Sequence, residues 1–136
     1  MAGEQNAVRV GSSGIIENGE GKILMALRGT YPSNIWVFPG GGVNFGETAA
    51  DAFVREVREE TGIDIDEPEY ITTLELIKTE KGIHRVIFFH RAKPKGGDIK
   101  PSDDVADLRW MTVDEITRTK NLGEVVVPVL KAAKYL

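Results

Sequence analysis

Short runs of hydrophobic residues, separated by glycine, proline and asparagine, dominate the pattern along this chain. Runs rich in valine, isoleucine and aromatic residues that are bounded by such turn residues are typical of β-strands. The Asn18-Gly19 pair between the first two runs favours a hairpin turn. The predicted strands cover residues 7–16, 22–28, 35–38, 70–77, 83–91 and 108–111, and the polar stretches 40–46 and 94–104 are expected to be loops.

A helical periodicity marks residues 48–61 as the clearest helix in the sequence. Thr48, followed three residues later by Asp51, resembles a capping box, and Gly62 is a typical left-handed stop for a helix. Shorter helices are expected at 113–116 and at 127–136. The apolar residues of the main helix predict one stripe that faces the core, made of Ala49, Ala52, Phe53 and Val57.

Length and composition restrict the classes of protein that fit. A chain of 136 residues has the length of one domain, so we expect a single domain over 1–136. A hydrophobic content of 41% and a charged content of 28% are ordinary for a globular protein and argue against intrinsic disorder. A formal charge of −4 disfavours general nucleic-acid binding, which usually leaves a basic footprint.

The absence of cysteine excludes disulfides, thiolate metal sites and a cysteine nucleophile. The first residues form neither a basic nor an apolar leader, and the longest aliphatic run stops at Pro128. We therefore expect no membrane span and a cytoplasmic location.

Three carboxylates stand together on the main helix. Glu56, Glu59 and Glu60 have the i, i+3 and i+4 spacing that places side chains on one helix face. Such like charges repel, and hard divalent ions such as Mg²⁺ or Mn²⁺ prefer oxygen ligands of this kind. A solvated helix surface, with Arg55 and Arg58 as salt-bridge partners, is the alternative interpretation of the same pattern.

The residues around this cluster favour the metal interpretation. From Gly41 to Ile63 the chain reads G-x5-E-x7-R-E-V-R-E-E-T-G-I. This segment resembles the signature of the Nudix hydrolases, G-x5-E-x7-R-E-U-x-E-E-x-G-U, where U is aliphatic, and every specified position is filled. The resemblance implies an α/β/α sandwich with a central mixed sheet, in which residues 41–63 form a loop-helix-loop box.

The resemblance also assigns roles within the box. It implies that Arg55 orients the catalytic carboxylates and that Glu47 lies near them at the helix entrance. Either Glu56 or Glu59 is implied as the general base, and the choice between them stays open. The implied metal ligands are Glu56, Glu59, Glu60 and the carbonyl oxygen of Gly40.

Outside the box, the resemblance points to a few further candidates. Asp104 lies in a loop before the Trp-containing late strand, where some relatives place another metal ligand. Arg28 corresponds to a position where relatives often hold phosphate, and Tyr31 and Gly41 are expected to contact substrate. We expect Trp36 to be a core residue.

Two histidines and one aromatic residue have weaker claims to function. His84 and His90 share one strand face by period two, and a structural role is expected for each. Phe45, in the loop before the main helix, could stack on a nucleobase.

The implied reaction is metal-dependent hydrolysis of a pyrophosphate bond in a small nucleotide. Residues 78–81, Lys-Thr-Glu-Lys, carry neither the proline typical of ADP-ribose pyrophosphatases nor the tyrosine typical of diadenosine polyphosphate hydrolases. A nucleoside triphosphate is therefore the favoured substrate, as in clearance of damaged nucleotides, with nucleotide sugars or ADP-ribose-type compounds as the alternative. A nucleotide-sensing module without catalysis is the alternative of a different class, and the resemblance leaves open a homodimer.

A role in removing phosphates from RNA ends would call for a basic stripe, which a pI near 5.2 disfavours. Lys93, Lys95 and Lys100 could still form a locally basic face.

Overall fold

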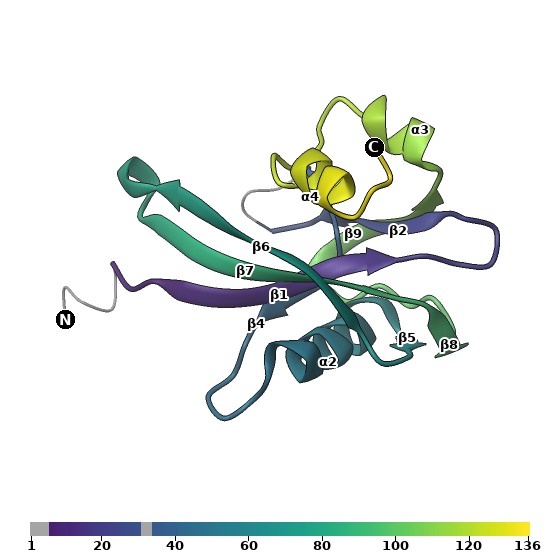
Figure 1. Ribbon diagram of the computed structural model, residues 1–136, viewed down its shortest axis with the longest axis horizontal. Coiled ribbons are helices and arrows are strands. Elements are labelled where there is room, and N and C mark those ends of the chain that lie inside the picture. Colours follow the sequence, from purple (N-terminus) through teal and green to yellow (C-terminus); the bar gives the residue numbers. More distant parts are fainter. Residues whose placement is uncertain (1–5, 31–33) are drawn as a thin grey trace.

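The computed structural model describes residues 6–30 and 34–136 and places its sheets between two helical layers (Figure 1). Helix α2 lies against one side, and α3 and α4 lie on the other. The strands are β1 (Arg9–Ile16), β2 (Ile23–Arg28), β3 (Trp36–Val37), β4 (Gly40–Gly42), β5 (Ile63–Ile65), β6 (Glu69–Lys78), β7 (Ile83–Ala92), β8 (Pro94–Gly97) and β9 (Val105–Met111). The helices are α2 (Ala49–Thr61), α3 (Val113–Thr117) and α4 (Val126–Ala132), with a 3₁₀ turn, η1, at Thr79–Lys81.

The largest sheet is mixed. Its strand order is β4-β1-β7-β6, in which β1 runs parallel to β7 and antiparallel to β4. A second sheet has the order β3-β2-β9, and β5 pairs with β8 in a third. The predicted α/β sandwich with a central mixed sheet is therefore confirmed.

Strands β1 and β2 supply two separate cores because successive strand residues point to opposite faces. Ile15 packs with α3 and α4, whereas Ile16, the next residue, packs with α2. In β2, Met25 joins the first core and Leu24 the second. The end of β1 and most of β2 are thus buried on both sides, which explains the nearly continuous apolar sequence of β2.

Helix α2 begins and ends where the sequence predicts. The Thr48 hydroxyl accepts a hydrogen bond from the Asp51 backbone N–H at 3.1 Å, which satisfies one free donor of the first turn. Gly62 has a φ of 78°, and its N–H donates to the Arg58 carbonyl. The buried face of α2 consists of Ala52, Phe53, Val57 and Thr61, while Ala49 is only half-buried.

The predicted hairpin between the first two strands is wrong. β1 and β2 enter different sheets, and only one isolated bridge, between Glu17 and Ile23, joins their ends. Asn18 does form a turn, because its side-chain oxygen accepts from the backbone N–H groups of Glu20 and Lys22. The predicted turn is therefore confirmed, but the pairing partner of each strand is set by distant parts of the chain.

Both predicted loops contain short strands that the hydrophobic pattern does not reveal. Strand β4 reads Gly-Gly-Gly, and β8 reads Pro-Lys-Gly-Gly, so neither carries apolar side chains that alternate. Strand β5, directly after α2, was not predicted either. The last helix is shorter than expected and ends at Ala132.

Other side chains behave as expected from their types. Trp36 is buried in the core that includes α4, as predicted. His90 is buried and its ring stacks on Phe53 with centroids 5.6 Å apart, while His84 lies 3.6 Å from the Glu75 carboxylate. Among the described helices, none has the length and apolar content needed to cross a membrane.

Candidate active site

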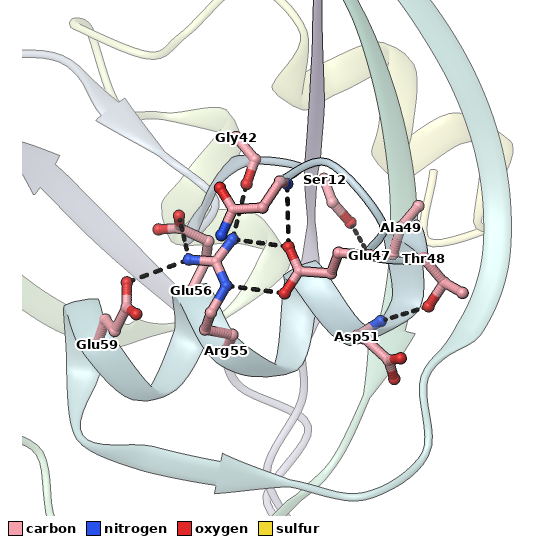
Figure 2. A network of polar contacts seen from close by, with 10 residues as sticks. Ser12, Gly42, Glu47, Thr48, Ala49, Asp51, Arg55, Glu56 and Glu59 are labelled. Carbon is pink, nitrogen blue, oxygen red and sulfur yellow. Dashed lines mark hydrogen bonds and ion pairs between the residues drawn. The ribbon is translucent and has the colours of Figure 1, made fainter.

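The Arg55 side chain, in the middle of α2, joins three carboxylates and one carbonyl (Figure 2). Its Nε and Nη2 donate to the two Glu47 oxygens at 2.8 and 2.9 Å, and Nη2 also donates to the Gly42 carbonyl at 2.9 Å. Its Nη1 donates to Glu56 at 2.9 Å and to Glu59 at 3.3 Å. Such a fork of donors fixes each carboxylate in direction as well as in distance.

These contacts shift the acidity of the groups that make them. The hydrogen bonds from Arg55, with one from the Asn44 backbone N–H, lower the pKa of Glu47 to about 2. The Glu47 hydrogen bond in turn raises the pKa of Arg55. Both groups therefore stay charged over the whole physiological range, and the pair is a permanent support for Glu56 and Glu59.

Gly41 brings backbone directly against the Glu56 carboxylate. Strand β4 pairs with β1, with Gly41 opposite Ser12. A Cβ at position 41 would lie 2.4 Å from both the carboxyl carbon and Oε2 of Glu56. Only glycine leaves room for this approach, which explains why the second of the three consecutive glycines, Gly41, has no side chain.

Glu60 is the most unusual carboxyl group of the site. It accepts a hydrogen bond from the Gly40 N–H at 2.7 Å, and burial raises its pKa to about 7. The negative charges of Glu56 and Asp104 push the pKa further up, whereas the positive charge of Arg28 pulls it down. Arg28 and Asp104, two candidates from distant parts of the chain, are thus electrostatic neighbours of the box.

Backbone contacts hold the Asp104 loop against α2. The N–H groups of Lys100 and Ser102 donate to the carbonyls of Thr61 and Glu60 at 2.7 and 3.1 Å. On the other side, the Gly29 N–H donates to the Asp104 carbonyl at 2.8 Å. The loop therefore uses the free carbonyls at the end of α2 and fixes Asp104 next to the end of β2.

Sequence reasoning missed the serines that lie under the box. Ser12 donates its hydroxyl hydrogen to the Ala49 carbonyl at 2.5 Å and lies 3.4 Å from Nδ1 of His90. Ser13 donates to the Pro39 carbonyl at 2.8 Å. Their position in a glycine-containing strand gave no signal, because these contacts depend on how β1 meets α2 and β4.

The NUDIX domain family model matches residues 7–131, which include every element of this site. This chain belongs to the NUDIX family. One relative is the RNA pyrophosphohydrolase of Acinetobacter baylyi, which is 40% identical over 112 residues, covering 79% of this chain and 59% of the relative. Another is the 8-oxo-dGTP diphosphatase of Buchnera aphidicola, 42% identical over 75 residues, covering 55% of this chain and 60% of the relative.

A solved NUDIX structure has nearly the same fold. The crystal structure of the MutT NUDIX hydrolase from Burkholderia pseudomallei matches with a TM-score of 0.84 and 26% identity, covering 93% of this chain and 98% of that one. The chain spans between 36% and 66% of the length of the first curated relatives it matches.

Most of the site residues predicted from the sequence lie in one region of this NUDIX domain. Contacts or charges link the box residues, with Arg28 and Asp104, into one group around the start of β4 and the face of α2. Tyr31 lies outside the described residues. Phe45 projects fully into solvent and contacts no other part of the site.

The carboxylate oxygens and the backbone around them are the hard ligands that Mg²⁺ and Mn²⁺ prefer. Within the part of the chain that the structure describes, however, no three acidic or histidine groups are drawn close enough together to hold one ion. Glu56 and Glu59 are instead bound to Arg55, and Glu60 is bound to the Gly40 N–H. The donor chemistry fits a divalent ion, and binding would require these side chains to turn toward it.

Proposed function

We propose that this NUDIX domain, acting as one unit over residues 1–136, hydrolyses a pyrophosphate bond in a nucleoside triphosphate with the help of Mg²⁺ or Mn²⁺. The observation that carries the proposal is the Arg55 network, which fixes Glu56 and Glu59 from one side. Hydrolysis of a pyrophosphate needs groups that accept a proton from water and that balance the negative charge of the phosphates. The carboxylates of this cluster meet the first need, and the divalent ion that they would hold meets the second.

The metal ion would be held by Glu56, Glu59 and Glu60 with the Gly40 carbonyl, and Asp104 is proposed as a further ligand. When bound, such an ion supplies charge neutralisation and lowers the pKa of water. Glu56 or Glu59 accepts the proton of the attacking water, and Arg55 keeps that carboxylate in place. Arg28 binds a phosphate oxygen, and Tyr31 and Gly41 contact the substrate.

Support for a triphosphate comes from the named relatives, since an 8-oxo-dGTP diphosphatase is 42% identical over 75 residues. The RNA pyrophosphohydrolase relative supports a related candidate, a triphosphate at the 5′ end of RNA. In both cases the reacting group would be a pyrophosphate at the 5′ position of a nucleotide. We propose that the protein acts in the cytoplasm on such compounds.

A substrate panel tests the proposal. Canonical and oxidised triphosphates, ADP-ribose, nucleotide sugars, dinucleoside polyphosphates and a 5′-triphosphate RNA are incubated with Mg²⁺, Mn²⁺ or EDTA, and the products are identified by mass. We expect metal-dependent cleavage of triphosphates, and Glu59→Gln and Glu60→Gln should each lower turnover by about 100-fold or more. Asp114→Asn, an exposed change on α3, is the matched control.

Two outcomes would contradict the proposal. Near wild-type activity in either glutamine variant would show that the metal ligands are wrong. Nucleotide binding without cleavage of any compound would instead indicate a sensing module.

A further inference from the structure

Two arginines lie side by side on the face of the large sheet that carries α4. In the parallel pair of β1 and β7, Arg9 is directly opposite Arg85. Alternation along each strand gives their direction, because Ile15 and Phe89 pack into the core with α4 and lie an even number of residues away. Both guanidinium groups therefore project from the same face.

The side chains that flank them across the sheet carry no negative charge, and Glu124, which lies against this face beside Leu76, is paired with Lys78 at 2.8 Å. Leu76 of β6 is opposite Arg85, and the next row toward the box consists of Gly11, Ile87 and Leu74. Like charges directly opposite one another destabilise a sheet unless something compensates for them. An arrangement of this kind calls for an anion from outside the sheet.

The other arginines of the protein contrast with this pair. Within residues 6–30 and 34–136, neither Arg9 nor Arg85 forms an ion pair or a side-chain hydrogen bond, and Arg28 has an interaction of its own. Ion pairs with carboxylates are formed by Arg55, Arg58, Arg91, Arg109 and Arg118.

The pair lies a short distance from the catalytic box. Gly11 is opposite Gly42 and Ser12 is opposite Gly41, which touches Glu56. At about 3.3 Å per strand residue, Arg9 lies about 7 Å beyond Gly42 and about 10 Å beyond Gly41. The row of Gly11, Ile87 and Leu74 lies beside the pair on the α4 face, whereas Glu56 meets Gly41 on the α2 face. A substrate that uses both sites therefore passes round β4, which is the edge strand of this sheet.

We propose that Arg9 and Arg85 together bind a second phosphate group of the substrate, separate from the pyrophosphate that is cleaved. Two adjacent guanidinium groups present several donors to one phosphate, which is the geometry that arginine recognises best. The pair then selects nucleotides that carry phosphate beyond the first nucleoside. This inference rests on the proposed function, because it assumes that the pyrophosphate lies at Glu56.

Three probes separate the sources of such a phosphate. GTP has no phosphate beyond its 5′-triphosphate. GTP with an added 3′-phosphate carries a further phosphomonoester, and the dinucleotide pppGpA carries a further phosphodiester. We measure kcat and KM for each with the wild type, Arg9→Gln, Arg85→Gln and Arg85→Lys. Arg118→Gln, at an exposed position directly after α3, is the control.

We expect the wild type to prefer at least one phosphate-bearing probe over GTP. For that probe, each glutamine variant should lower kcat/KM by about 10-fold to 100-fold, mainly through KM, while GTP cleavage stays unchanged. Arg85→Lys should retain part of the preference because it keeps the charge. A preference for GTP carrying the 3′-phosphate indicates a monoester site, and a preference restricted to pppGpA indicates a phosphodiester site.

Equal kinetics of the wild type and both glutamine variants on all three probes would overturn the inference. The inference would also be overturned if the glutamine variants lost as much kcat/KM on GTP as on the two probes with an additional phosphate. If the wild type cleaves none of them, the proposed function fails separately, and the arginine pair is then tested by calorimetric binding of pppGpA. Equal affinity of the wild type and Arg85→Gln in that assay would also overturn it.

Discussion

Arg55 binds both carboxylate oxygens of Glu47, at 2.8 Å through Nε and at 2.9 Å through Nη2, although eight residues separate them in the chain. One guanidinium thereby connects the loop before α2 to the helix surface that carries Glu56 and Glu59. The loop and the helix are consequently fixed relative to each other before any ligand binds.

Replacing this guanidinium by an amine tests its geometric role. A lysine at position 55 keeps the charge but cannot contact Glu47 and Glu56 at the same time. We expect Arg55→Lys to lower kcat by about 100-fold or more while the far-UV circular dichroism spectrum stays unchanged. Arg58→Lys, at a largely exposed position on the same helix, should retain full activity. Equal activity of the two variants would contradict the role of Arg55.

A methyl group at Gly41 should disturb the site without disturbing the fold. The added Cβ would meet the carboxylate of Glu56 at 2.4 Å, and that carboxylate is the far end of a flexible side chain, which can shift without moving the backbone. We expect Gly41→Ala to lower kcat/KM by more than about 10-fold, because small displacements of catalytic groups are costly. Gly19→Ala, where nothing lies within 4 Å of the new Cβ, is the control. A thermal midpoint lowered as much as the activity would show that the effect is structural.

The raised pKa of Glu60 predicts a pH dependence of stability in the metal-free protein. Its pKa is about 7 in the folded chain against an ordinary value of 4.5, so the folded state keeps the proton longer. The free energy of unfolding should therefore fall as the pH rises from 4.5 to 7, by about 3 kcal/mol in total. Urea denaturation in EDTA measures this loss, and Glu60→Gln should not show it. The same pH profile in both proteins would contradict the assignment.

Two phenylalanines in neighbouring segments should differ sharply in their contribution to stability. Phe53 is completely buried and stacks on His90, so Phe53→Ala leaves a cavity and should cost about 3–5 kcal/mol of unfolding free energy. Phe45 is fully exposed, and Phe45→Ala should change that free energy by less than about 0.5 kcal/mol. Thermal or urea unfolding of the two variants makes the comparison. Similar losses would mean that Phe45 packs against the protein in solution.

Local signals explain which parts of the fold were predictable from sequence. The limits of α2 follow from Thr48 and Gly62, which act on their own backbone neighbours. The strands rich in valine and isoleucine were likewise found, because burial on a face leaves a periodic pattern. By contrast, β4 consists of three glycines and is a strand only because β1 lies beside it.

The candidate site was likewise only partly predictable from the sequence. The spacing of Glu56, Glu59 and Glu60 was visible in the sequence, but their different surroundings were not. Burial raises the pKa of Glu60, the charges of Glu56 and Asp104 raise it further, and the hydrogen bond from Gly40 opposes the shift. The pairing of Arg9 with Arg85 also needs the register of two strands that are more than 60 residues apart, which no local pattern encodes.

The alternation of Ile15 and Ile16 between two cores has a consequence for the unfolding of the protein. Because one strand contributes to the packing on both sides, neither helical layer can detach and leave the other layer intact. A deletion of one residue within β1 would exchange the two sets of side chains and would also shift Ser12 away from Gly41. Amide protons of β1 and β2 should therefore exchange with solvent together, in a single opening event that abolishes both cores and the active site at once.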